Sequence, residues 1–370
     1  MIFIYNNHYS IRGDNSMRAA SKLIDKTALS HNIKALSAIA PASKMIAVIK
    51  ANAYGHEATA VYDALDEAGL FAVASAEEAL ALRRAGSKKQ IVLLEGAFEP
   101  SDVQLAFANN FELVIATPEQ LTWLLAFPHT FSRVWFKLDT GMGRLGFQAH
   151  DADQAMQKLL TRYSQHQTVI MTHFASADSP DRGYTEKQIS SFDEFAKNYP
   201  DCEQSLCNSA GTLSYPQAHR SYVRCGISLY GVSPLENHHG TDHGLAPAMT
   251  LKTRVMSVKK YLTGEKIGYG CTYQMPAPGH IAICEVGYAD GYLCFIPNGT
   301  PVIIGGRRYQ LAGRVSMDMI AVSVDQHVAA GDEVICWGKT LPIEIIADRA
   351  GTVPHQLLTA VTERPKMVLT

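Results

Sequence analysis

Lys50 is the first residue whose type and position indicate chemistry. The apolar run Lys44-Met-Ile-Ala-Val-Ile-Lys50 predicts a buried strand that ends at this lysine. Where parallel strands close into a barrel, reacting groups stand at the carboxyl ends of the strands. Partial burial at such a position lowers the pKa of a lysine and makes it a nucleophilic amine. From position alone, a surface lysine at a loop entry is the alternative.

The residues around Lys50 resemble the pyridoxal-phosphate (PLP) attachment motif of alanine racemases. The matching segment is Val48-Ile-Lys-Ala-Asn-Ala-Tyr-Gly-His56, an order that seldom arises by chance. The resemblance extends from about residue 17 to the end of the chain. It continues in order through Lys137–Gly146, Thr172–Asp178, Asn208-Ser209, Arg224–Gly231, Gly268–Tyr273, Val286–Gly291 and Gly313–Asp318. It implies a homodimer that interconverts L- and D-alanine, with Lys50 holding PLP as a Schiff base.

The resemblance also implies the cofactor contacts. Arg224 matches the arginine that faces the pyridine nitrogen of PLP. A guanidinium gives up no proton, so that nitrogen stays unprotonated and the ring is a weaker electron sink. His173 matches a histidine that contacts the cofactor and the catalytic tyrosine, although a lone histidine at a strand end also suits a buried structural role. The phosphate contacts match Tyr54, Ser209, Gly226 and Ile227.

Three further positions match residues around the substrate. Arg144 corresponds to the arginine that helps to hold the substrate carboxylate, a role that suits the guanidinium fork. Met317 lies in the segment that contacts the same carboxylate. Lys137 matches a lysine that is often carbamylated in this family, where it orients the arginine.

Tyr269 in Gly-Tyr-Gly-Cys-Thr-Tyr273 matches the second catalytic base. A racemase removes the α-proton from one face and returns a proton on the other, which two opposed bases do most simply. The resemblance implies that Lys50 serves one face, acting on D-alanine. Tyr269 of the other subunit would serve the opposite face, acting on L-alanine. A packing tyrosine of the second domain is the alternative.

Two positions depart from the family pattern. Many relatives carry a phosphate-contacting tyrosine just before Arg364, whereas this chain has Glu363. An arginine that is common in the entry channel is Cys294 here. We expect the chemistry to be unaffected, and the selectivity for alanine over other amino acids is left open.

The elements that must position these residues follow a βα pattern up to about residue 230. Eight strands are predicted near Lys44–Lys50, Phe71–Ser75, Ile91–Leu94, Phe111–Ala116, Val134–Leu138, Val169–Phe174, Gln204–Cys207 and Tyr222–Ile227. Helices are predicted at His56–Gly69, Ala76–Ala85, Pro118–Ala126, Ala152–Tyr163 and Glu186–Asn198. Eight βα units in this length indicate an α/β fold with an N-terminal (β/α)8 TIM-type barrel.

The domain organisation follows from a change of pattern after residue 244. From Met249 onward, β-branched runs separated by glycine predict a smaller, mainly β domain, with helices only at Ile343–Ala350 and Val353–Val361. We therefore expect an N-terminal extension at 1–16, the PLP-binding barrel at 17–245 and the β domain at 246–370.

Composition excludes several classes of protein. The net charge is -2 and basic residues are scattered, so neither nucleic acid nor a membrane surface is an expected partner. The 7 cysteines form no CxxC pair, which argues against a zinc site and favours a reducing compartment. The first 16 residues do not read as a signal peptide, and no stretch is long and apolar enough to span a bilayer. Composition therefore predicts a cytoplasmic protein without metal. The resemblance implies that it supplies D-alanine for peptidoglycan in the cell wall or allows D-alanine to be catabolised.

Other interpretations remain open from sequence. Asp139-Thr-Gly141 has the composition of the aspartic-protease tripeptide, but it ends a strand within the βα series. His238, His239 and His243 are potential metal ligands, but a solvated inter-domain loop is the better explanation for them. A PLP decarboxylase of the same architecture is the nearest enzyme alternative. A PLP-binding carrier built on the barrel alone is a non-enzymatic one.

Overall fold

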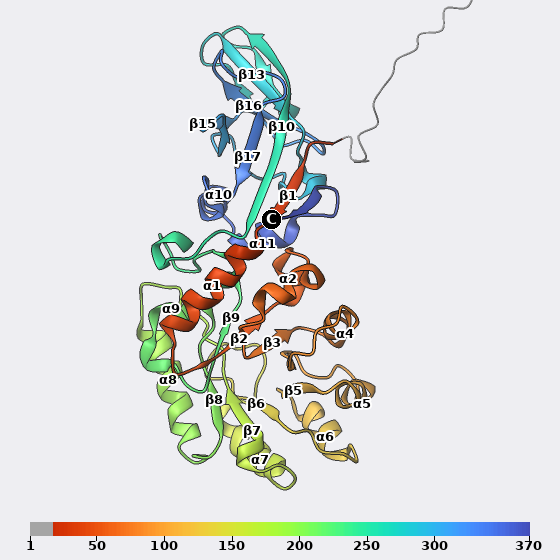
Figure 1. Ribbon diagram of the computed structural model, residues 1–370. Coiled ribbons are helices and arrows are strands. Elements are labelled where there is room, and N and C mark those ends of the chain that lie inside the picture. The colour runs from red at the N-terminus through yellow and green to blue at the C-terminus, as the bar shows by residue number, and fades with distance from the viewer. Residues whose placement is uncertain (1–17) are drawn as a thin grey trace, which may run out of the picture.

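The computed structural model describes residues 18–370 and contains two domains (Figure 1). Eight parallel strands close into a barrel in the order β2 to β9, as the sequence predicts. The strands are β2 (Lys44–Val48), β3 (Leu70–Val73), β4 (Ile91–Leu93), β5 (Phe111–Ile115), β6 (Val134–Lys137), β7 (Thr168–Met171), β8 (Glu203–Ser205) and β9 (Tyr222–Cys225). The predicted N-terminal extension at 1–16 lies outside the described residues.

Most of the barrel strands are short, largely apolar runs that are buried on both faces, as parallel strands covered by helices must be, whereas β8 is polar and only partly buried. The helices around them are α1 (Lys26–Ile39), α4 (Ala76–Arg84), α5 (Pro100–Ala108), α6 (Pro118–Ala126), α7 (Ala149–Leu160), α8 (Gly183–Ala196) and α9 (Ser209–Ser214). Helix α6 begins where Thr117 caps it by accepting from the Gln120 N–H, with Pro118 in the first turn. The core is therefore continuous from the barrel interior to the inner faces of these helices.

The second domain is an eight-stranded sheet, nearly all antiparallel. Its strands are β10 (Met249–Tyr261), β13 (Gly279–Cys284), β14 (Pro301–Ile304), β15 (Arg307–Leu311), β16 (Ile320–Val324), β17 (Glu333–Trp337), β1 (Ser21–Ile24) and β18 (Lys366–Leu369). Because β13 pairs with both β16 and β10, six of the strands form a closed ring. Figure 1 shows β10 running away from the barrel toward the far tip of this domain. The predicted barrel followed by a mainly β domain is confirmed.

Both ends of the described chain join the sheet of the second domain. Strand β1 pairs antiparallel with β10 and parallel with β18, so residues before the barrel add a strand to the later domain. Two helices complete that domain, α10 (Ile343–Ala350) and α11 (Pro354–Ala360). No helix within residues 18–370 has the length and apolar character needed to cross a membrane.

One helix in the barrel differs from its prediction. The segment His56–Gly69 was expected to be one helix, but it contains the short α3 (Ala58–Val61) followed by a 3-10 turn, η1 (Tyr62–Leu65). The late start of α3 has its cause in Glu57, whose backbone is left-handed with a φ of 66°. A right-handed helix therefore cannot start before Ala58.

Candidate active site

Lys50 lies at the carboxyl end of β2, directly after the buried run that the sequence predicts. Its side chain is half-buried, and its amine makes no hydrogen bond or ion pair with residues 18–370. Strand β2 pairs with β3 on one side and β9 on the other, which places Lys50 beside the ends of both strands. A partly buried amine without a partner is available as a nucleophile or a base.

The chain turns in an unusual way after Lys50. Four consecutive residues, Ala51–Tyr54, have φ values between 51° and 55°, the left-handed region that costs a non-glycine residue roughly 1–2 kcal/mol. Side chains compensate for this cost. Glu78 accepts the Ala51 N–H at 2.6 Å, and the Nδ1 of buried His56 lies 3.0 Å from the Ala53 carbonyl. We call the segment Lys50–Tyr54 the left-handed turn.

The second domain braces the left-handed turn from its other side. Lys22 on β1 donates to Glu57 Oε1 at 3.0 Å, and Glu57 Oε2 in turn accepts from Asn52 Nδ2 at 3.0 Å. Helix α11 packs so closely that a Cβ on Gly55 would lie 2.4 Å from the Leu358 carbonyl oxygen. The position of the turn therefore depends on both domains.

Arg224 on β9 is fully enclosed among neutral acceptors. Its guanidinium donates to the Ser205 carbonyl and hydroxyl at 2.9 and 2.7 Å, and to the Thr172 carbonyl at 2.6 Å. No carboxylate of residues 18–370 pairs with it. Burial lowers the pKa of Arg224 to about 10, so it remains a cation at neutral pH. It is a fixed positive charge at the ends of the barrel strands.

His173 at the end of β7 touches this guanidinium. Arg224 Nη2 lies 3.4 Å from His173 Nδ1, and because a guanidinium only donates, Nδ1 must accept. The ring proton of the neutral histidine is then on Nε2. Burial, and then the Arg224 charge, hold the pKa of His173 well below its usual value. His173 is therefore neutral at physiological pH.

Lys137, the last residue of β6, is 7% exposed and makes no hydrogen bond or ion pair within residues 18–370. Burial, followed by the charges of Arg224, Arg144 and Lys50, lowers the pKa of Lys137 to about 8. A substantial fraction of this amine is therefore neutral near physiological pH, unlike an ordinary surface lysine.

A set of donors suited to an anion lies between β2 and β9. The Ser209 hydroxyl oxygen accepts the Gly226 N–H at 2.9 Å, and the buried Ile227 N–H makes no hydrogen bond within residues 18–370. A Cβ on Gly226 would lie 2.4 Å from the Tyr54 hydroxyl oxygen, so only glycine leaves room here. Burial raises the pKa of Tyr54 to about 12, which keeps its hydroxyl a donor.

Arg144 lies on the loop that follows β6, and its side chain is exposed. Asp139 Oδ1 folds this loop by accepting the N–H groups of Gly141 and Gly143 at 2.9 and 3.1 Å. Gln188 on α8 ties the loop to the end of β7, donating to Thr140 Oγ1 at 3.2 Å and to the His173 carbonyl at 3.1 Å. The tripeptide Asp139–Gly141 is thus part of a barrel loop.

Tyr269 and Met317 lie on the second domain and are 70% and 52% exposed. Their segments are neighbours, since a Cβ on Gly268 would lie 3.5 Å from the Arg314 backbone nitrogen. Arg364 binds Asp318 at 2.7 Å, directly beside Met317. Neither Tyr269 nor Met317 contacts the barrel residues described above in any recorded hydrogen bond, ion pair or ring contact, so one chain displays two separate groups of predicted site residues.

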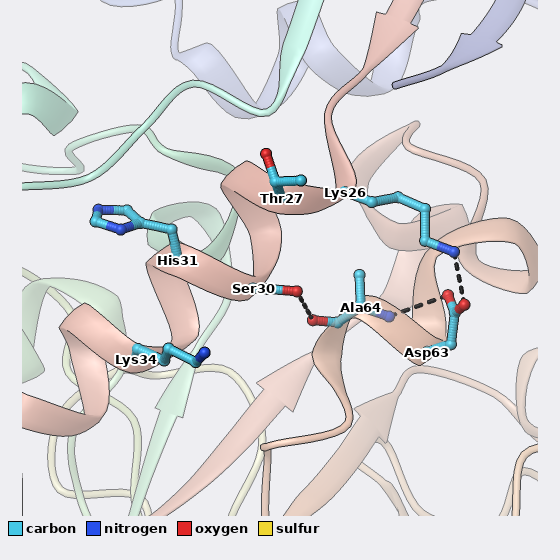
Figure 2. A pocket seen from close by; sticks show the side chains of 7 residues that line it. All are labelled: Lys26, Thr27, Ser30, His31, Lys34, Asp63 and Ala64. Carbon is cyan, nitrogen blue, oxygen red and sulfur yellow. Dashed lines mark hydrogen bonds and ion pairs between the residues drawn. The ribbon is translucent and has the colours of Figure 1, made fainter.

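A surface depression elsewhere, on α1 and η1, contains none of the predicted residues (Figure 2). It has a volume of about 460 Å³ and is lined by Lys26, Thr27, Ser30, His31, Lys34, Asp63 and Ala64. Its cations are already paired, Lys26 with Asp63 at 2.6 Å and Lys34 with Glu67 at 3.1 Å. Within residues 18–370 no group of acidic, histidine or cysteine side chains is arranged to hold a metal ion.

The sequence missed the side chains that brace the site. Glu78 and Gln188 act on groups of segments distant in sequence, so no local pattern distinguishes them. His355 on α11 was missed as well. Its ring centroid lies 5.8 Å from that of Tyr54, and burial followed by the Lys50 charge lowers the pKa of His355. The one clue in the sequence would have been that His355 lies in the last helix before the C-terminal strand.

Comparisons with known proteins match both domains. The model of the alanine racemase N-terminal domain matches residues 24–234, and that of the C-terminal domain matches residues 248–369. A protein named alanine racemase from Pectobacterium carotovorum is 44% identical over 355 residues, covering 94% of this chain and 98% of that protein.

Solved structures agree. The biosynthetic alanine racemase of Pseudomonas aeruginosa has a TM-score of 0.91 and 39% identity, covering 96% of this chain and all of its own. The Bartonella henselae alanine racemase, described with covalently bound pyridoxal phosphate, has a TM-score of 0.84 and 26% identity. That match covers 95% of this chain and 99% of the other.

Proposed function

Because this chain belongs to the alanine racemase family and is a racemase, we propose that it interconverts L- and D-alanine with PLP held on Lys50. One observation carries the proposal. The partly buried Lys50 amine, which has no partner in residues 18–370, lies at the same barrel end as Arg224 and the donor set of Tyr54, Ser209 and Ile227.

The residues present fit PLP. A phosphate needs hydroxyl and N–H donors in a space that glycine keeps open, and the Tyr54, Ser209, Gly226 and Ile227 group supplies them. Arg224 would face the pyridine nitrogen and, being a cation with no proton to release, would leave that nitrogen unprotonated. When bound, PLP withdraws electrons from the α-carbon of an amino acid and makes its α-proton removable.

The chain supplies the two bases that inversion requires. Lys50 would take or return the proton on one face of the α-carbon, and Tyr269 on the other. Tyr269 is exposed on the second domain and has no recorded contact with the barrel site of its own chain. We therefore propose that the chain forms a homodimer, in which Tyr269 of the partner subunit acts on the opposite face of the α-carbon.

Arg144 and Met317 would hold the substrate carboxylate. The exposed guanidinium of Arg144 has no ion-pair partner within residues 18–370 and is free to bind a carboxylate through two parallel hydrogen bonds. Met317 lies near Tyr269 on the second domain, so the same partner subunit would contribute both residues. D-Alanine made in this way would serve peptidoglycan synthesis, or its removal would serve catabolism.

A direct assay tests the proposal. Purified protein with added PLP and L-alanine should produce D-alanine, measured by chiral chromatography, until the two enantiomers are equal. A protein that bound no PLP and made no D-alanine would refute the proposal. Release of carbon dioxide from a basic amino acid, without racemisation of alanine, would instead support the decarboxylase alternative.

We expect Gly226→Ala to weaken PLP binding at least about tenfold. The new Cβ would meet the Tyr54 hydroxyl and push the ring out of the donor set, and such overpacking costs about 1–3 kcal/mol. Titration of the apoprotein with PLP, followed by absorbance, measures the effect. Gly183→Ala is the matched control, because the new Cβ would make only an ordinary contact of 3.4 Å at the start of α8.

Lys137 is proposed to carry a carbamate. Its neutral amine adds to carbon dioxide, forming one N–C bond and releasing one proton to solvent. The product replaces a cation with an anion beside Arg224, Arg144 and Lys50, which relieves their repulsion and gives Arg144 an anionic neighbour that can orient it.

The pH dependence of this carbamate follows from the lowered pKa of Lys137. With a pKa of about 8, most of the amine is neutral at about pH 8.5 and about 3% at about pH 6.5, so carbamylation should rise with pH. Carbon-13 NMR with labelled bicarbonate should show one carbamate signal that is absent from Lys137→Gln. A signal that persists in that variant would assign the modification to another amine.

A further inference from the structure

Glu78 bridges two successive βα units next to Lys50. It lies in the first turn of α4, which follows β3, and its two carboxylate oxygens point to different strand ends. Oε2 accepts the Ala74 N–H at 2.9 Å, at the end of its own unit. Oε1 accepts the Ala51 N–H at 2.6 Å, in the turn that follows β2. A local helix cap would need only the first of these bonds.

The second bond controls the peptide that joins Lys50 to Ala51. Glu78 is the one hydrogen-bond acceptor of the Ala51 N–H within residues 18–370. Charge-assisted bonds from a carboxylate are roughly twice as strong as neutral ones. The bond is made at the first residue of four that adopt the disfavoured left-handed backbone. Without the anchor, the Ala51 N–H loses its partner, and the peptide can shift toward the common right-handed region and move Lys50 with it, although the Ala51 carbonyl still accepts the Gly55 N–H at 3.1 Å.

We infer that Glu78 is a positioning residue for Lys50, fixing the direction in which the lysine leaves the end of β2. The inference rests on the proposed function, because it assigns Glu78 a role in that reaction. Other contacts hold the far part of the turn. His56 Nδ1 contacts the Ala53 carbonyl, and the Glu57 carboxylate links Lys22 to Asn52. Glu78 is the side chain that holds the end carrying the amine, beside backbone hydrogen bonds of Ile49 and of the Ala51 carbonyl.

Two variants separate positioning from helix capping. Glu78→Asp keeps the charge and a cap for α4, but its shorter side chain cannot span from Ala74 to Ala51. Glu78→Gln keeps one acceptor and turns an NH2 donor toward a backbone N–H. Glu77→Gln is the matched control, since Glu77 is acidic, exposed and in the same helical turn.

Kinetics give the first readout. A small misplacement of a reacting group lowers catalysis steeply. We expect kcat per bound PLP to fall at least about tenfold in both Glu78 variants, with KM for alanine within about twofold because Arg144 and Met317 are untouched. Glu78→Asp should keep the melting temperature of the wild type. Values of kcat in both variants equal to that of Glu77→Gln would overturn the inference.

A second readout needs no cofactor. The apoprotein is methylated with formaldehyde and cyanoborohydride, and Lys50 labelling is measured by peptide mass spectrometry against exposed Lys266. If Glu78 no longer fixes the turn, Lys50 should be methylated at least about threefold faster, relative to Lys266, in both Glu78 variants than in the wild type. An unchanged ratio would overturn the inference. If the wild type fails to racemise alanine, the proposed function falls, and the labelling ratio still decides whether Glu78 positions Lys50.

Discussion

Lys50→Met is expected to abolish covalent PLP attachment and to slow alanine racemisation by about four orders of magnitude. The amine is both the proposed anchor of the cofactor and one of the two bases, so one substitution removes two functions. Methionine has nearly the same length and no titratable group. Since Lys50 is half-buried and has no partner within residues 18–370, the fold should lose little stability.

Three measurements define the result. D-Alanine formation gives the rate, PLP absorbance after gel filtration shows retention, and peptide mass spectrometry after borohydride reduction locates the covalent bond. Lys44→Met is the matched control, because Lys44 begins the same strand and its side chain is exposed. That control should racemise alanine within about twofold of the wild type. Borohydride labelling at a lysine other than Lys50 would contradict the assignment.

The barrel was predictable because its pattern is local. Strands such as Leu70–Val73 and Ile91–Leu93 are continuous apolar runs, and the apolar positions of helices such as Ala149–Leu160 recur with the helical period. Counting such units identifies a closed barrel without any knowledge of distant contacts. The strands β10, β14, β16 and β17 were likewise visible as β-branched runs between glycines.

Elements that depend on distant partners were not predictable. Strand β1 has only four residues, and its partners β10 and β18 lie at the other end of the chain. Arg307 and Arg308 directly follow the turn Gly305-Gly306, yet they open strand β15 opposite β14. Strand pairing, which the sequence does not display, decides both cases.

The site residues likewise fall into those that could be predicted from the sequence and those that could not. Lys50, His173 and Arg224 stand at strand ends and lie in recognisable segments, so they could be proposed from the sequence, and the structure brings Arg224 and His173 into contact. Glu78 and Gln188 carry no motif of their own, because their role is to tie the loop of a neighbouring βα unit to their own unit. Such bracing residues are defined only by the three-dimensional structure.

Mixing two inactive variants is expected to restore activity. Lys50→Met and Tyr269→Phe should each be nearly inactive as homodimers, because each removes one base from every site. If Tyr269 is supplied by the partner subunit, a heterodimer of the two variants contains one site with both wild-type residues and one with neither. Isolated heterodimers, carrying two different affinity tags, should therefore show about half of the wild-type activity per dimer.

The result separates two arrangements that activity assays on single variants cannot. If Lys50 and Tyr269 of one chain formed the site, each site of the heterodimer would carry one of the two substitutions. The activity would then stay as low as that of the two single variants. The 70% exposure of Tyr269 and the lack of any recorded contact with the barrel site favour the shared arrangement. Glu78 and Tyr269 would then act on opposite sides of one site. Glu78 would fix Lys50 from within its own chain, while dimer formation would bring the opposing base, so weakening the dimer should abolish racemisation without disturbing Lys50.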